Sequence, residues 1–189
     1  LRGLLDRGLR RVLILVQDAF SGLLPITKSL FPSADVQLCI VHMQRNAKSH
    51  LSKTDNAEFQ LRLRSIKAGW DVELASAQFE QLCERFDSSS PAFVAELMKK
   101  KDHYLNFLKY PLPIRRSLST TNAVEAVNGQ LERMRRNNGG YFHSEDTLKL
   151  KLGMAISYLE SGTWRRVSAS VNAALDQLNI QFASRFEKE

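Results

Sequence analysis

Two carboxylates stand where metal-binding side chains are commonly found. Asp18 directly follows the apolar run 12–17, and Glu125 lies 125 − 18 = 107 residues later, near the start of a helical pattern. The residue after a buried parallel strand lies at the carboxyl edge of the sheet, where open α/β sheets bind ligands. Carboxylate oxygens are the hard ligands that Mg²⁺ prefers, and a strand-end carboxylate can share a two-metal site with one on a neighbouring helix.

A simpler interpretation of both residues stays open. An Asp after a strand is often a turn or cap residue. Glu125 stands three residues after Asn122, which is the spacing of a capping box at a helix start. A cap fixes the start of the helix that aims the carboxylate, so Glu125 can serve both purposes.

Cys39 and His42 have a spacing that zinc sites use. A zinc site needs further ligands at suitable spacing, and the remaining candidates form no second compact pair: His50, His103, His143 and Cys83. We therefore expect no zinc at Cys39 and His42, and we expect Cys39 to be a small buried residue on a strand.

The basic residues indicate a polyanionic partner. The net charge is +7 and the pI is near 9.6, which suits nucleic acid, although a merely basic surface has the same composition. Arginines flank the helix of Glu125: Arg115 and Arg116 before it, and Arg133, Arg135 and Arg136 at its end. We expect them to contact DNA phosphates, while those at the end also complement the helix dipole.

The elements that position these residues follow from periodicity. Apolar runs predict strands over 12–17 and 36–41, joined by a helix over 21–31 with Pro25 in its first turn, as a right-handed βαβ unit. A short helix closed at Gly8 precedes them. Helices are expected over 43–51, 56–69, 72–86, 91–101 and about 122–136, and another follows a cap at Ser144. One predicted buried stripe comprises Leu74, Ala77, Phe79, Leu82 and Phe86, and Trp70 and Trp164 are expected in the core.

Hydropathy and cysteine content indicate the cellular compartment that the sequence suits. No run approaches ~18 apolar residues, so no membrane span is expected. With two cysteines and no signal-peptide pattern after Leu1, the sequence suits a reduced, cytoplasmic protein, and we expect a fragment whose upstream part is missing.

Three segments together resemble a known family. They are V-x-D-x-x-x-G-L over 16–23, Cys-x₂-His over 39–42, and T-T-N-x-V-E over 120–125. They resemble the Mutator-type bacterial transposases, a branch of the DDE enzymes with an RNase H-like core, and the resemblance extends from Arg7 to Arg185. In that family the first segment carries the second catalytic Asp and the last carries the catalytic Glu, which correspond here to Asp18 and Glu125.

The resemblance implies a fold and a set of partners. The expected fold is α/β and mostly helical: a partial RNase H-like core of two parallel strands, interrupted by an all-α insertion. The expected division is 1–42 for the core, 43–113 for the insertion and 114–189 for the Glu125 helix and the helices after it. The complete enzyme would use Mg²⁺ or Mn²⁺, bind transposon ends and target DNA, act as a homo-oligomer, and place His42 near the scissile phosphate as a hydrogen-bond donor.

One feature departs from the family pattern. The first catalytic Asp has no counterpart, because Asp6, Asp35 and Asp55 stand in other contexts. We therefore expect part of an enzyme that cuts and joins DNA by metal-dependent phosphodiester transfer, inactive by itself. The alternative is a non-catalytic helical remnant that binds DNA or a transposase chain.

Overall fold

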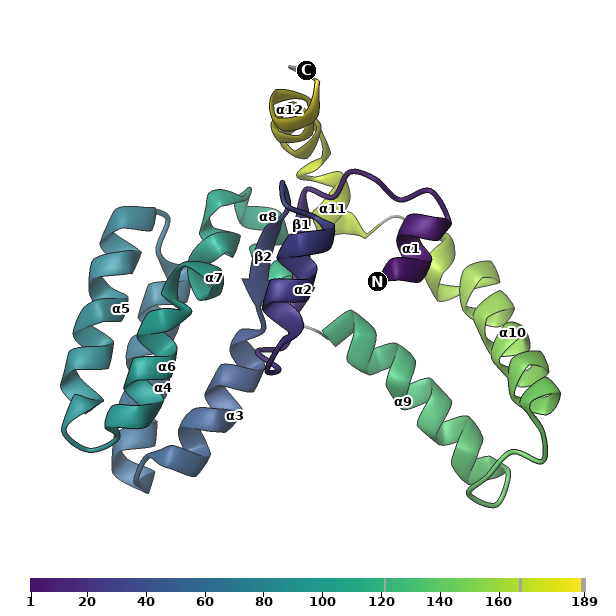
Figure 1. Cartoon of the computed structure of the whole chain (residues 1–189), viewed down its shortest axis with the longest axis horizontal. Coiled ribbons are helices and arrows are strands. Elements are labelled where there is room, and N and C mark those ends of the chain that lie inside the picture. The colour runs from purple at the N-terminus through teal and green to yellow at the C-terminus, as the bar shows by residue number, and fades with distance from the viewer. Residues whose placement is uncertain (121, 167, 188–189) are drawn as a thin grey trace. The chain divides into compact units, whose positions relative to one another are not determined.

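The core of the chain is a βαβ unit. In the computed structural model, β1 (Ile14–Gln17) and β2 (Asp35–Leu38) form a parallel pair, with Ile14 opposite Asp35 and Gln17 opposite Leu38. Helix α2 (Leu23–Leu30) connects them (Figure 1). Pro25 lies in the first turn of α2, as predicted. The structure describes residues 1–120, 122–166 and 168–187, without the side chains of residues 122–124, 126 and 163.

The second strand is shorter than predicted, which changes the surroundings of Cys39. The predicted strand 36–41 ends at Leu38, and α3 (Ile40–His50) begins before the predicted position 43. Ile40 and Val41 extend the apolar run and resemble a strand in sequence, but the chain turns at Cys39, which is the N-cap residue of α3. Cys39 is buried as predicted, but it lies at a strand–helix junction instead of on the strand.

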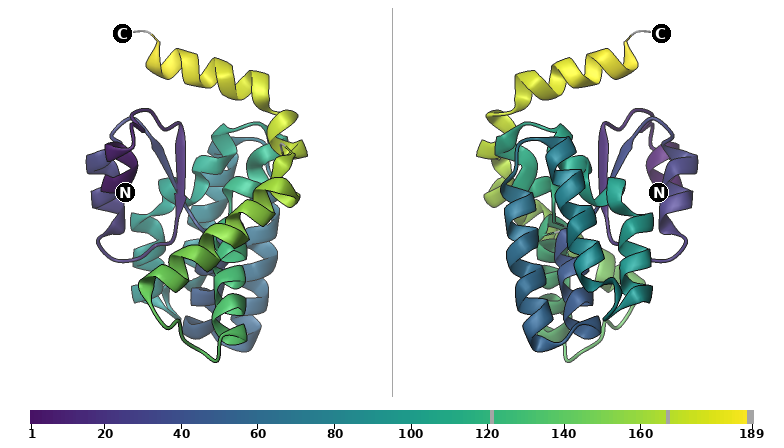
Figure 2. Two further views of the ribbon diagram at one scale, coloured as in Figure 1. Left: turned by 90° about the vertical axis from the view of Figure 1, so that its right-hand side faces the viewer. Right: turned by 90° about the vertical axis from the view of Figure 1, so that its left-hand side faces the viewer.

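A block of helices follows β2. Its elements after α3 are α4 (Lys53–Ala68), α5 (Val72–Asp87), α6 (Pro91–Lys99), α7 (Lys101–Leu105), the 3₁₀ helix η1 (Asn106–Lys109) and α8 (Leu112–Leu118). Residues 43–109 contain no strand, in agreement with the expected all-helical stretch. The sequence did not predict α8, because prolines that interrupt helices elsewhere occupy its N-cap and first turn. The sheet lies between α2 and this helical block (Figure 2).

The helical block is packed around aromatic side chains. The Phe59 ring lies 5.9 Å from both Phe86 and Phe93 between centroids, and Phe79 is fully buried against Tyr104. The predicted stripe on α5 is partly wrong, since Leu74 and Ala77 are exposed while Ala75 and Cys83 are buried. The buried face is therefore rotated relative to the predicted one over the first turns of the helix.

Side chains of the helical block close one edge of the sheet. The buried amide of Asn106 donates to the Val36 carbonyl at 2.8 Å. The buried Gln37 side chain accepts from the Phe107 N–H at 2.7 Å and donates to the Tyr104 carbonyl at 3.0 Å. On this edge of β2 the Val36 carbonyl and the Gln37 side chain thus bond to the helical block instead of a further strand. The outer edge of β1 remains the unpaired edge of the described sheet.

The last helix returns to the sheet. Arg185 of α12 (Leu175–Phe186) donates to the Leu13 carbonyl at 2.8 Å and forms an ion pair with Asp35 at 2.9 Å. The Tyr110 hydroxyl donates to the same carboxylate at 2.7 Å. These contacts attach the end of the chain to the starts of β1 and β2.

The chain divides into two compact units. Unit 1 comprises 1–121 and 174–189, and unit 2 comprises 122–173. Unit 1 also contains α1 (Arg2–Asp6), which ends as predicted at Gly8, with a φ of 95°. Unit 2 contains α9 (Asn122–Asn137), α10 (Glu145–Ser161), the 3₁₀ helix η2 (Thr163–Arg165) and α11 (Ala169–Asn172). The predicted functional division at residues 42 and 113 is a separate hypothesis and stays a prediction.

The predicted fold class, mostly helical α/β with two parallel strands, is confirmed. The expectation that both tryptophans lie in the core is wrong: Trp70 is 86% exposed and Trp164 is 46% exposed. Across the described ranges, no helix has both the length and the apolar character that crossing a bilayer requires.

Candidate functional site

Asp18 lies at the carboxyl end of β1, as its sequence context predicts. The buried Gln17 before it accepts a hydrogen bond from the Thr27 hydroxyl of α2 at 2.6 Å, which fixes the strand end against the helix. Gly22, with a φ of 80°, reverses the chain into α2 four residues later. The Asp18 side chain lies at the sheet edge and is 45% exposed, although its Oδ1 atom is buried.

The strand register brings Cys39 and His42 to the same corner. The Cys39 N–H donates to the Gln17 carbonyl at 2.8 Å, which continues the pairing of Gln17 with Leu38 by one residue. His42 lies in the first turn of α3, and its Nδ1 is 2.9 Å from Asp18 Oδ1. The imidazole therefore faces the carboxylate directly.

Asp18, Cys39 and His42 form what we call the donor triad. A carboxylate oxygen, the thiol sulfur and an imidazole nitrogen all lie within 4.8 Å of one another, in the only such group found in the described part of the chain. Sequence reasoning missed Asp18 as a partner of Cys39 and His42 because it searched for ligands at short spacing along the chain. The parallel pairing of the two predicted strands was the signal that could have found it.

Glu125 belongs to unit 2 and is described within that unit. It lies in the first turn of α9 and its side chain is half-buried. A carboxylate in the first turn is favoured by the helix dipole, which agrees with the simpler interpretation. The predicted cap at Asn122 falls among the side chains that the structure does not describe.

The arginines before α9 differ from each other. The Arg115 guanidinium donates to the carbonyls of Tyr110, Gly69 and Leu108 at 2.8–2.9 Å. Burial lowers the pKa of Arg115 from its ordinary value. These bonds join α8 to the end of α4 and the end of η1, which is a structural role. Arg116, in contrast, is exposed.

The arginines at the end of α9 also differ. Arg135 donates twice to Glu132, at 2.8 and 2.7 Å, and once to the Gly140 carbonyl at 2.7 Å. Hydrogen bonds from Arg135 and then Arg136 lower the pKa of Glu132 to about 2. Arg135 thus holds the loop after α9 in place. The Arg136 side chain is 75% exposed and donates one hydrogen bond to Glu132 at 3.1 Å, and Arg133 is exposed.

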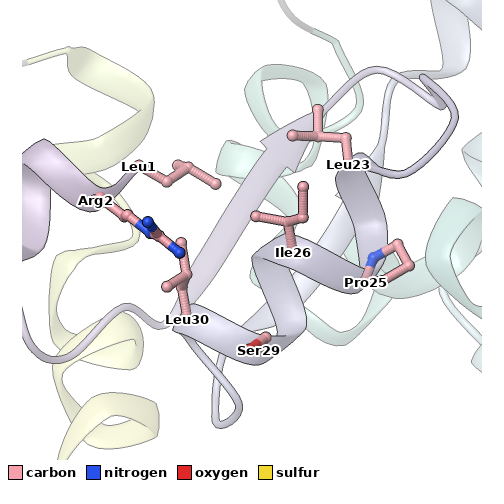
Figure 3. A pocket seen from close by; sticks show the side chains of 7 residues that line it. All are labelled: Leu1, Arg2, Leu23, Pro25, Ile26, Ser29 and Leu30. Carbon is pink, nitrogen blue, oxygen red and sulfur yellow. The ribbon is translucent and has the colours of Figure 1, made fainter.

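Two surface hollows of unit 1 have different chemistry. A hollow of about 710 Å³ between α1 and α2 is mainly apolar (Figure 3), and its lining residues are Leu1, Arg2, Leu23, Pro25, Ile26, Ser29 and Leu30. A second hollow, of about 500 Å³, adjoins the loop after Asp18 and is lined by Phe20, Asn46, Lys99, His103 and Tyr104, among others. The second hollow therefore places aromatic faces and basic groups close to the donor triad.

Comparison with known proteins identifies the family. Residues 1–164 match the family described as "Transposase, Mutator family", which is most of the chain and includes both carboxylates and the Cys-x₂-His segment. The chain belongs to this family. The family resemblance stated from the sequence is therefore confirmed.

The most similar relatives include transposases of bacterial insertion sequences. The chain is 30% identical over 182 residues to the transposase for insertion sequence element ISRM3 of Rhizobium meliloti, covering 96% of this chain and 45% of that protein. A probable transposase for an ISRM3-like element of Sinorhizobium fredii shows the same identity and coverage. The transposase for insertion sequence element IS905 of Lactococcus lactis is 28% identical over 130 residues, covering 68% of this chain and 32% of that protein. The chain thus spans less than half the length of these relatives.

Proposed function

We propose that this chain is a region of a DNA transposase that supplies two acidic metal ligands, Asp18 and Glu125. The complete enzyme would cut and join DNA at transposon ends by metal-dependent phosphodiester transfer, and its core would be RNase H-like. One observation carries the proposal: in a chain that belongs to the Mutator family, Asp18 lies at the carboxyl end of β1 and is accessible to solvent. DNA is the proposed substrate and partner, and a homo-oligomer is the proposed acting form.

The side chains suit Mg²⁺ or Mn²⁺. Asp18 offers hard carboxylate oxygens on a fixed strand end, and Glu125 offers another carboxylate in the first turn of a helix. When bound, such ions activate the attacking oxygen and neutralise charge on the phosphate. Asp18 and Glu125 would each supply a ligand to the metals. His42 would donate a hydrogen bond to a backbone phosphate when its imidazole carries a proton on the nitrogen turned away from Asp18.

Loss of either carboxylate provides the test. In the complete protein we expect Asp18→Asn and Glu125→Gln each to abolish cleavage of transposon-end DNA, because each removes an anionic ligand and keeps the side-chain shape. Asp176→Asn and Glu160→Gln, at exposed positions, remove the same charge and should leave cleavage intact. Near-normal cleavage by Asp18→Asn or Glu125→Gln would instead favour the non-catalytic, DNA-binding or transposase-binding alternative.

We also propose that the 189-residue chain by itself neither cleaves nor joins DNA. The family pattern has a third acidic residue, with no counterpart here. Two carboxylates leave a two-metal site short of anionic ligands. The assay is strand transfer with a pre-cut transposon end in Mg²⁺ or Mn²⁺, and metal-dependent joining above background would refute this part of the proposal.

The proposed DNA contacts are salt-sensitive and tolerant of sequence. Arg116, Arg133 and Arg136 are exposed, and Lys99 lines the hollow beside the Asp18 loop. Each lost phosphate contact should reduce the slope of log affinity against log salt by about 0.9. We expect the double variant Arg133→Ala, Arg136→Ala to lower the slope by about two such steps. Arg135→Ala should change it less, because Arg135 donates two hydrogen bonds to Glu132 and one to Gly140, whereas Arg136 donates a single bond to Glu132.

Arg115 is the control for this surface. It was predicted as a DNA contact, but its guanidinium donates to three backbone carbonyls, so we leave it out of the proposed surface. Arg115→Ala should destabilise the fold and leave the salt slope of the folded protein unchanged. An unchanged slope in the Arg133, Arg136 double variant would place the DNA surface elsewhere.

A further inference from the structure

The donor triad contains three kinds of ligand atom at one corner of unit 1. Asp18 contributes a carboxylate oxygen, Cys39 a sulfur and His42 the Nδ1 nitrogen, all within 4.8 Å of one another. Ligands of a tetrahedral zinc ion, at about 2.0–2.3 Å from the metal, lie roughly 3.3–3.8 Å apart. The Asp18–His42 distance of 2.9 Å is below this range, and no two of the three donor atoms are more than 4.8 Å apart, so small shifts of the side chains would complete a site.

The backbone holds the three residues in place without a metal. The Cys39 N–H is bonded to the Gln17 carbonyl, and the Ile40 N–H to the Ser119 carbonyl at 2.9 Å. These bonds fix the start of α3 against the ends of β1 and α8. The N-terminus of α3, an eleven-residue helix, also favours anionic groups such as a thiolate or a carboxylate near Cys39.

Two of the donor atoms face each other without forming a hydrogen bond. Asp18 Oδ1 and His42 Nδ1 are both buried, and neither has a hydrogen-bond partner of acceptable geometry among the described residues, although they are 2.9 Å apart. The close approach brings the two atoms together, but their alignment is poor for a hydrogen bond. Buried polar atoms usually have partners, so this pair calls for a ligand that interacts with both.

We propose that Asp18, Cys39 and His42 form a site for a borderline-soft divalent cation of the zinc class. Sulfur and imidazole nitrogen prefer such ions, whereas Mg²⁺ prefers oxygen ligands. Three protein ligands leave one coordination position open, as in catalytic zinc sites. The site shares Asp18 and His42 with the proposed transposase function, but its binding test needs no transposase activity, so the two proposals can fail separately. It also revises the expectation from spacing alone, because Asp18 supplies the ligand that the sequence search did not find.

Two neighbouring basic side chains lower the expected affinity of this site for a metal ion. Arg45 NH1 lies 3.5 Å from His42 Nε2, and Lys67 is close enough to interact electrostatically with Cys39. With a metal on Nδ1 the imidazole carries its proton on Nε2, so the exposed Arg45 side chain must turn away. We therefore expect the ion to bind weakly enough to exchange with solvent, and we expect the chain to fold without it.

The test is cobalt spectroscopy on the 189-residue chain. Co²⁺ replaces Zn²⁺ in such sites and gives a near-ultraviolet charge-transfer band only when a thiolate is a ligand. We expect a stoichiometric band with Co²⁺ in a thiol-free reductant, its loss on adding Zn²⁺, and its persistence in a large excess of Mg²⁺. Cys39→Ser should abolish the band, while Cys83→Ser, which removes the only other cysteine, should keep it.

Two shape-conserving variants make the result decisive. His42→Asn and Asp18→Asn should weaken Co²⁺ binding by at least the roughly 10–100-fold that loss of a supporting contact around a metal costs. Far-ultraviolet circular dichroism and the metal-free melting temperature confirm that each variant is folded. Absence of the band in the unchanged chain, a band that survives Cys39→Ser, or displacement of Co²⁺ by Mg²⁺ would each overturn the proposal.

Discussion

Units 1 and 2 are both built mainly of helices, yet they differ in what the helices bury. In unit 1, aromatic side chains such as Phe59, Phe79 and Phe86 are almost fully inaccessible. In unit 2, α9 and α10 contain no buried side chain among those described, and α10 exposes Leu150, Met154 and Tyr158 at intervals of four residues. Apolar periodicity therefore predicts a helix in both units, but it does not reveal whether the apolar face is covered within the chain.

The largest expected difference between the two units is the stability lost when an aromatic side chain is removed. Phe79→Ala should lower the free energy of unfolding by about 3–5 kcal/mol, because it removes a fully buried ring next to Tyr104. Tyr158→Ala, at a 78% exposed position, should change it by no more than about 0.5 kcal/mol. Urea unfolding monitored by circular dichroism measures both. A comparable loss for Tyr158→Ala would show that unit 2 has a buried core after all.

A smaller difference between the units is expected in the stability lost when an asparagine that donates to a backbone carbonyl is replaced by Ala. Asn106→Ala should cost about 1–3 kcal/mol, since it removes the shorter of two contacts to the buried-edge Val36 carbonyl, 2.8 Å from Asn106 and 3.2 Å from His103 Nδ1. Asn138 donates to the Met134 carbonyl at 2.6 Å in the half-buried loop after α9, and Asn138→Ala should cost about 0.5–1 kcal/mol. Chemical denaturation measures the loss of stability in each variant. Equal losses for Asn106→Ala and Asn138→Ala would contradict the contrast in burial.

Helix caps of equal geometry should act differently in the two units. Ser52 and Ser144 each accept a backbone N–H at 3.1 Å, at the starts of α4 and α10. Replacing either by Ala should cost its helix about 1 kcal/mol. We expect Ser52→Ala to lower global stability by that amount. Ser144→Ala should mainly accelerate amide hydrogen exchange in α10, because the unit around it buries little. A shift of global unfolding by Ser144→Ala would indicate that the two units unfold together.

The weakest expected effect depends on pH. Burial, followed by the charge of Lys28, lowers the pKa of His103 below its ordinary value of 6.5. The unfolded chain then takes up a proton at this residue at a higher pH than the folded chain, so stability falls as the pH is lowered below about 6.5. Unfolding measured across this range should show the dependence. His103→Gln should reduce it, and His143→Gln, at an exposed position in unit 2, should not.

Local sequence signals predicted much of the fold. Gly8 ends α1, Pro25 lies in the first turn of α2 and Ser144 caps α10, because each of these depends on a few neighbouring residues. The exposed positions of Trp70 and Leu74 were not predictable in this way, since burial depends on which helices pack against each other. The start of α3 at Ile40 was missed because an apolar run has no period that separates a strand from a buried helix turn.

The candidate site shows the same limit. The context of Asp18 at a strand end was predictable from the apolar run before it. Its approach to His42 depends on the register of two strands and on the turn at Cys39, which bring together residues 24 positions apart (42 − 18 = 24). The contrast between Arg115, bonded to three carbonyls, and the exposed Arg116 has no signal in the sequence of two adjacent arginines.

The attachment of Arg185 to the Leu13 carbonyl has a consequence for how the chain folds. The two residues are 172 positions apart, so this contact closes a very long loop and raises the contact order of unit 1. During synthesis the start of β1 emerges long before its partner on α12, and the two cannot meet until residue 185 has been made. We therefore expect the helical block to acquire protection early in refolding, and the sheet with α12 to be consolidated last.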